Sequence, residues 1–195
     1  MKKIIMALLA LFPILYGYAQ PLYSTQKTAG FSSAIQQVLQ DFPANFHHIS
    51  GDLLLKQAEI ENYESLVKLP GAESCTVTRY HSVEDTTASW QAIMYRNEDF
   101  NTATLKYKAL YQQLKGCYLQ LVDGSMFYLN SEYENPAEEK PFAVSTLRVK
   151  TGDDRYKEVK IDLEMVYQFP EWVIHINVVS KKKDTLEGYA NPDGK

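Results

Sequence analysis

The stretch VKIDLEMVYQFPEWVIHINVV, residues 159–179, decides the fold. Its first half alternates apolar and mostly polar residues, with the apolar set formed by Val159, Ile161, Leu163, Met165 and Tyr167. A turn at 169–171 follows, and a second alternating row begins at Trp172. Alternation of this kind is typical of antiparallel strands with one buried and one solvated face. The stretch therefore predicts a hairpin of two long strands, which we expect to be the most stable part of the protein.

Further strands are predicted on the N-terminal side of this hairpin. Residues 143–150 join it through a turn at 151–154, and β-forming residues also dominate 63–69, 74–81, 88–96, 118–122 and 126–130. Asp123-Gly124 is a strong signal for a hairpin turn between the last two of these. Residues 46–62 fit either a buried strand or a short helix.

Two segments have helical periodicity. The apolar residues of the first recur with the spacing of one helix face from Phe31 to Phe42, and Pro43 ends the run. The second covers residues 100–114, where Asp99 is suited to cap the start and Gly116 to adopt a left-handed conformation after the end.

The order of these elements predicts the fold class. We expect an α+β fold in which two amphipathic helices pack on one face of an antiparallel meander sheet, because each helix and the sheet have one apolar surface to bury. The helices begin roughly 70 residues apart, which is compatible with a tandem duplication of a helix-plus-meander unit. No motif assigns the chain to a known family.

The first residues have the features of a bacterial secretory signal peptide. Lys2 and Lys3 precede an apolar run at 4–15, and Gly17-Tyr18-Ala19 is a small-x-small cleavage site. The run is shorter than the ~20 residues that a membrane span needs. We therefore predict a signal peptide at 1–19, a flexible lead-in at 20–29, a single domain at 30–180 and a polar tail at 181–195. The protein is expected to be periplasmic or secreted, without a membrane span after cleavage.

Composition excludes several classes of protein. The chain has 195 residues, of which 45% are hydrophobic and 23% charged, so neither a disordered nor a collagen-like protein is expected. Cleavage after residue 19 leaves 18 basic and 24 acidic residues, a formal charge of −6. An acidic protein of this kind provides no basic surface for nucleic acid.

The sequence contains none of the common catalytic or phosphate-binding motifs, and we predict no catalytic residue, no metal site and no cofactor. His47 and His48 are adjacent, and neither a strand nor a helix would orient both rings well toward one ion. His81, beside Glu84 and Asp85, and His175, two positions before Asn177, have some chemistry suited to a base with a carboxylate or a polar partner. We interpret both as ordinary polar residues of strands.

One segment has the composition of a binding loop. Residues 124–136 combine Tyr, Ser, Asn and Gly, and tyrosine offers a large contact area at low entropic cost. The predicted ligand-binding residues are Tyr128, Asn130, Tyr133 and Asn135.

Cys75 and Cys117 are the two cysteines, and in an exported protein they are expected to form a disulfide. One argument opposes the pairing, because the second helix is expected to carry Cys117 toward the opposite end of the sheet from Cys75. A diagonal helix crossing, or a strand that returns beside Cys75, would remove that conflict.

Together these features favour a non-catalytic binding or interaction module. Its expected ligand is a protein, a peptide or a glycan, bound through the exposed sheet face or the 124–136 loop. Two alternatives remain open. One is a hydrolase that uses a histidine with a nearby carboxylate in a deep pocket, and the other is an envelope scaffold or secretion chaperone.

Overall fold

A computed structural model describes residues 25–81 and 86–180, and the predicted signal peptide, the predicted C-terminal tail and Glu84 and Asp85 lie outside these ranges. The described part contains two α-helices, two short 3₁₀ helices and nine strands in one sheet. In chain order the elements are α1 (Thr25–Asp41), η1 (Phe42–Ala44), β1 (Ser50–Lys56), β2 (Ile60–Ser65), β3 (Ser74–His81), β4 (Thr86–Asn97), α2 (Phe100–Lys115), β5 (Tyr118–Gln120), β6 (Met126–Glu132), β7 (Phe142–Val149), η2 (Asp154–Tyr156), β8 (Val159–Gln168) and β9 (Glu171–Ser180).

The predicted α+β class with an antiparallel meander sheet is confirmed. The strand order is β1-β2-β3-β4-β9-β8-β7-β6-β5, and every adjacent pair is antiparallel. The chain forms one meander from β1 to β4, crosses along α2 to the far edge, and returns as a second meander that ends with β9 beside β4. The tandem duplication suggested by this order stays a prediction.

The hairpin formed by residues 159–179 occupies the middle of the sheet. β8 and β9 pair over their whole length, from Val159 opposite Ser180 to Gln168 opposite Glu171. The apolar rows predicted for the two strands are buried, with Ile161, Leu163 and Ile176 at 0% exposure. The exception is Tyr167 near the turn, which is 40% exposed. Burial of each such side chain contributes about 1.5–3 kcal/mol.

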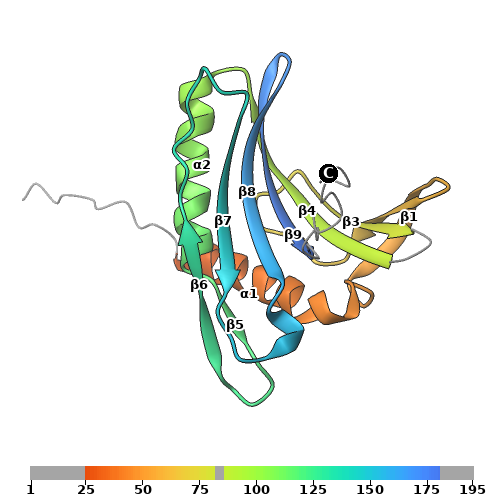
Figure 1. The fold of residues 1–195 in the computed structure, drawn as a ribbon. Helices are drawn as coiled ribbons and strands as arrows, with labels where there is room; N and C mark the ends of the chain where they lie inside the picture. Colours follow the sequence, from red (N-terminus) through yellow and green to blue (C-terminus); the bar gives the residue numbers. More distant parts are fainter. Residues whose placement is uncertain (1–24, 82–85, 181–195) are drawn as a thin grey trace, which may run out of the picture.

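Helix α2 packs along β4, β6, β7, β8 and β9, and α1 crosses near its lower end beside β5 (Figure 1). Asp99 caps α2 as predicted, because its carboxylate accepts a hydrogen bond of 2.7 Å from the backbone N–H of Thr102. The prediction for Gly116 was wrong, since its φ of −82° is an ordinary right-handed value. Gly124, with a φ of +87°, does provide the left-handed residue of the β5–β6 turn.

The apolar stripe of α2 carries one buried hydroxyl into the sheet. The Tyr107 hydroxyl lies 2.7 Å from Ser145 Oγ and 3.1 Å from the carbonyl oxygen of Leu163. A buried tyrosine needs such partners, because an unpaired hydroxyl in the core costs free energy. This contact fixes α2 against β7 and β8.

Strand β1 forms one edge of the sheet and resolves the ambiguity over residues 46–62. Leu53, Leu54 and Leu55 lie in this strand but remain 45–58% exposed, so the strand is not a buried one. Register shifts interrupt its pairing with β2 on both sides of Leu53. Bulges and charged residues at an edge hinder pairing with another chain, and Asp52 and Lys56 flank the leucines.

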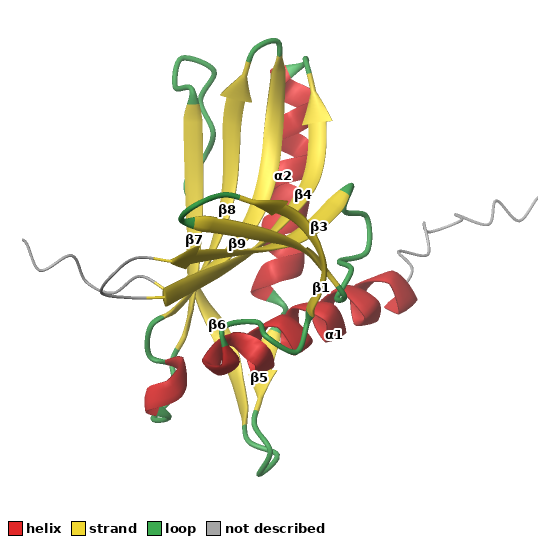
Figure 2. Cartoon of the chain, turned by 90° about the vertical axis from the view of Figure 1, so that its right-hand side faces the viewer, coloured by secondary structure: helices red, strands yellow, loops and turns green. Residues whose placement is uncertain are grey.

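The sheet is strongly bent. In Figures 1 and 2, β7 and β8 run upright alongside α2, while β1, β3 and β4 extend to the side that α2 does not cover. The bend encloses part of that uncovered side, which we call the polar face. It is defined by the residues in register with Asp162 and Glu164, whose side chains point away from the apolar rows.

Candidate functional site

The polar face contains a groove of about 450 Å³. It is lined by residues of β3, β4, β7, β8 and β9, namely Tyr80, Thr87, Ala88, Ser89, Val144, Lys160, Asp162, Glu164 and Val179. In a flat sheet β3 and β7 would lie about 19 Å apart, at ~4.8 Å for each strand spacing. The bend of the sheet brings them to one hollow, whose volume is in the range of ligand sites.

A row of polar residues runs across the floor of this face. Residues opposite one another on paired strands share a face, and Thr146, Asp162, Asn177, Gln91 and Thr76 are aligned in this way from β7 to β3. The Thr146 hydroxyl donates to Asp162 Oδ1 at 2.7 Å. The amide of Gln91 donates to Asn177 Oδ1 at 2.8 Å. These bonds hold the four side chains in place.

Lys160 and Asp162 form an ion pair within the groove. Lys160 Nζ lies 2.6 Å from Asp162 Oδ2, and Asp162 is only 5% exposed. A buried carboxylate is tolerated because the ammonium group and the Thr146 hydroxyl both bind it. The lysine charge is therefore already neutralised.

Glu164 and His175 occupy the next row and face each other across β8 and β9. Burial raises the pKa of Glu164 and has the largest effect. The hydrogen bond from Asn177 lowers this pKa, while the nearby charge of Asp162 raises it. Burial, and then the charge of Arg96, lowers the pKa of His175. His175 is 8% exposed, and its Nδ1 has no hydrogen-bond partner among the described residues.

This environment corrects part of the expectation from the sequence. The face opposite the apolar row was expected to be mostly solvated, and His175 to be an ordinary polar strand residue. Instead, His175 and Asp162 on this face are buried, and Asp162 and Glu164 line the groove.

His81 pairs with a carboxylate on an exposed surface. Its Nε2 lies 3.1 Å from Glu61 Oε2, and the His81 side chain is 43% exposed. Glu61 also binds Lys56 and Tyr63, and these hydrogen bonds lower its pKa to about 2. His81 therefore belongs to a surface network of charges.

Within residues 25–81 and 86–180, the closest pairing of a histidine with a carboxylate was not predicted from the sequence. His48 Nδ1 lies 2.6 Å from Asp41 Oδ1, at a turn where Asn45 and Phe46 both have positive φ. The His48 side chain is 73% exposed, so this pair lies on an open surface. Within the described ranges, no group of three His, Cys, Asp or Glu residues is placed to hold a metal ion.

The predicted residues of the 124–136 segment do not form one site. Tyr128 and Asn130 are exposed on β6, where Asn130 is in register with Arg148 and Lys160 and so extends the polar face. The Tyr133 ring packs on Tyr111 of α2, with 4.7 Å between ring centroids.

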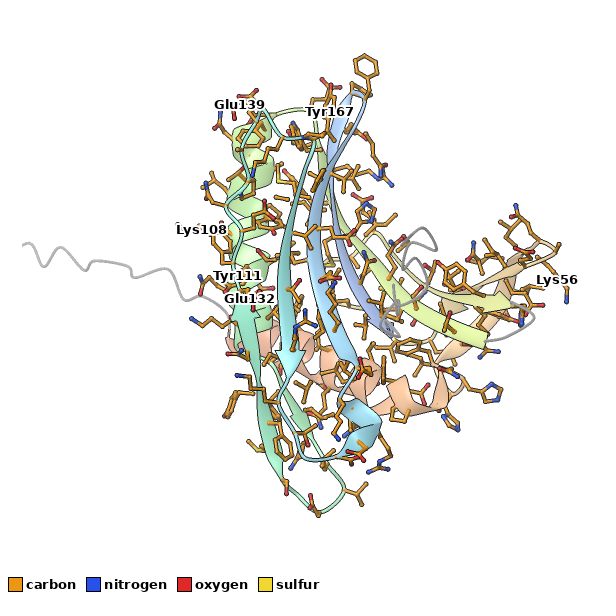
Figure 3. The ribbon with its side chains drawn as sticks, viewed as in Figure 1. Lys56, Lys108, Tyr111, Glu132, Glu139 and Tyr167 are labelled. Atoms are coloured by element: carbon orange, nitrogen blue, oxygen red, sulfur yellow. The ribbon has the colours of Figure 1, made fainter. Side chains whose placement is uncertain are left out.

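Asn135, also exposed, bonds the carbonyl of the next residue at 3.2 Å. In Figure 3, Tyr111 and Glu132 mark the place where this segment passes α2. The ligand-binding role of the four residues stays a prediction.

A second hollow of about 350 Å³ lies at the opposite end of α2 from β5. It is lined by Glu98, Glu138, Glu139, Pro141, Tyr167 and Trp172. Figure 3 shows Glu139 and Tyr167 at this end of the molecule. Substitutions of its residues can serve as controls for substitutions in the groove.

The predicted disulfide was wrong, because both cysteines are free and buried. Cys75 lies on β3 and pairs in register with Ala92, whereas Cys117 follows α2 and leads into β5 at the far edge of the sheet. The helix carries Cys117 away from Cys75, and the strand after it does not return beside β3. Each thiol has a local partner instead: Cys75 Sγ accepts from the N–H of Leu69, and Cys117 Sγ lies 3.3 Å from the carbonyl oxygen of Gln113.

Comparisons with protein-family models, with curated proteins and with solved structures find no match to this chain. Among the helices of the described part, none is both long and apolar enough to cross a membrane.

Proposed function

We propose that this protein is an exported, non-catalytic binding module whose ligand site is the groove on the polar face. The observation that carries the proposal is the groove itself, a partly open hollow lined by hydroxyl, carboxyl and apolar side chains. Of these, the Asp162 carboxylate is held in place by the Thr146 hydroxyl. Export is supported by the signal-peptide features of residues 1–19 and places the module in the periplasm or outside the cell.

The proposal includes the packing of both helices on the face opposite the groove. The buried stripes of α1 and α2 belong to one core cluster with the apolar rows of the sheet, including Ile35, Leu114, Leu163 and Ile176. With both helices on that side, the polar face is left uncovered and can bind a ligand.

A hydrolase is less well supported. A catalytic histidine lies in a cleft, where a carboxylate or another group within hydrogen-bond reach orients it. His81 and His48 have such carboxylates but are exposed, and no hydrogen bond joins His175 to Glu164 among the described residues. An envelope scaffold remains compatible with the same groove, since it too needs a partner surface.

A matched pair of variants tests the proposal. Ser89 lines the groove, whereas Ser74 lies on the same face at the end of β3 and outside it. The exported protein and its Ser89→Trp and Ser74→Trp variants are immobilised and exposed to an extract of the cell envelope, after thermal unfolding has shown equal stability. We expect the protein and Ser74→Trp to retain a ligand that Ser89→Trp does not. Equal retention by both variants would refute the groove as the site.

A further inference from the structure

The charge of the groove limits the ligands it can take. Three charged residues line it, and the ammonium group of Lys160 is bound to Asp162. Glu164 is the remaining charged group, and burial favours its neutral form. The lining therefore carries between zero and one negative charge, and it offers no free cation to a phosphate, a sulfate or another anion.

The groove is not suited to a peptide that adds a strand to a sheet. Its lining combines apolar side chains, among them Ala88, Val144 and Val179, with polar and charged ones. An extended peptide is commonly bound by addition to a sheet edge, through main-chain hydrogen bonds. The edges of this sheet are β1 and β5, and none of the five strands that line the groove is an edge. A ligand in the groove must be recognised by side chains.

Those side chains are rich in hydroxyl and carboxyl groups. Tyr80, Thr87 and Ser89 can each donate and accept a hydrogen bond, while Asp162 and Glu164 accept when ionised. The Tyr80 ring is 43% exposed and presents a flat apolar surface at one wall. A fitting ligand has many donors and acceptors, no negative charge, and flat C–H surfaces between its polar groups.

We infer that the groove binds an uncharged saccharide chain. This inference rests on the proposed function and names its ligand class. Sugar hydroxyls supply donors to the carboxylates and both donors and acceptors to the hydroxyl residues, and the C–H face of a sugar ring can lie on Tyr80. The groove is open along the surface, so the ends of a chain can extend beyond it.

Chemical-shift mapping on the ¹⁵N-labelled exported protein tests this inference. The probes are four uncharged tetrasaccharides, built from α-linked glucose, β-linked glucose, β-linked N-acetylglucosamine and α-linked mannose. Tetragalacturonate is the anionic counterpart, and a neutral Ser-Gly hexapeptide is the peptide probe. The variants are Tyr80→Ala and Glu164→Gln, and the matched controls at the second hollow are Tyr167→Ala and Glu139→Gln.

We expect at least one neutral tetrasaccharide to give saturable shifts in β3, β8 and β9, with tetragalacturonate binding at least tenfold more weakly. Tyr80→Ala is expected to weaken binding at least tenfold, Glu164→Gln to weaken it measurably, and the controls to change it less than twofold. Mass spectrometry should recover the probe intact, since its hydrolysis would overturn the non-catalytic function.

Two negative results have different meanings. If no tetrasaccharide shifts the groove while the hexapeptide or an envelope extract does, the saccharide inference is overturned and the groove remains a binding site. If saccharides, hexapeptide and extract all leave the groove unshifted, the proposed function fails as well.

Discussion

Glu164 lies on the polar face in an environment that makes its contribution to stability depend on pH. Burial raises its pKa in the folded protein, so its contribution to stability is fully present below the unfolded pKa of about 4.5 and is lost as pH rises through the folded value. Replacement by glutamine keeps the hydrogen bonding with Asn177 and removes the charge. We expect Glu164→Gln to raise the Tm at pH 7.5 and to leave it nearly unchanged at pH 4.

Thermal unfolding at the two pH values measures this, with the surface variant Glu139→Gln as control. His175 titrates in the opposite sense: its lowered pKa gives stability above pH 6.5 that is lost as pH falls. That loss is common to the protein and the variant, and so it cancels in their difference. A lower Tm for Glu164→Gln at pH 7.5 would contradict the burial of a charge at this position.

The two cysteines are expected to titrate as free thiols. Denatured without reductant, the protein should give two thiols per chain, and a value near zero would restore the disulfide. In the native protein both should react slowly with iodoacetamide at pH 8, because burial raises the pKa of Cys75 and raises that of Cys117 to about 11.

Single residues were predicted unevenly from the sequence, and the reason is physical. The Asp99 cap depends on neighbours three positions away and was predicted. The Asp41–His48 contact depends on a turn with positive φ at both Asn45 and Phe46. Asparagine is favoured in that conformation but phenylalanine is an outlier, so the sequence did not indicate the turn. Ionisable groups such as His175 depend on burial, which one strand's alternation does not reveal.

At the scale of elements, the β8–β9 hairpin is expected to be the centre of stability. It pairs with β4 on one side and β7 on the other, and both of its apolar rows are buried except for Tyr167. Amide hydrogen exchange should be slowest in these two strands, and Ile161→Ala should cost about 2–5 kcal/mol of unfolding free energy. Slower exchange in β2 and β3 than in β8 and β9 would contradict this account.

Elements with strong periodicity were predicted well. The bounds of β3 agree with the predicted 74–81, and both helices were found from their apolar stripes. Helix α1 begins at Thr25, within the segment predicted as a lead-in. Strand β2 lies at Ile60–Ser65, not at the predicted 63–69, because Val67 and Leu69 are buried in the connection that follows it. Buried residues of a loop follow no periodic pattern in the sequence. A strand predicted from hydrophobicity alone is therefore extended into such a loop.

At the scale of the whole molecule, the bend of the sheet creates the candidate site. Local patterns predicted the strands and the polarity of each face, but curvature accumulates over nine strands and their irregularities, and no single segment encodes it. The groove therefore brings together Tyr80 and Val144, which lie on strands separated by three others. Neither residue was marked as a candidate by the sequence.

The central claim is that the polar groove, and not the 124–136 loop, receives the ligand. The most direct measurement is a ¹⁵N-resolved shift map of the exported protein titrated with an extract of its own cell envelope. The account predicts the largest shifts at Tyr80, Ser89, Asp162, Glu164 and Val179, with small ones at Tyr133 and Asn135. Shifts concentrated at residues 124–136, with the groove unchanged, would contradict it.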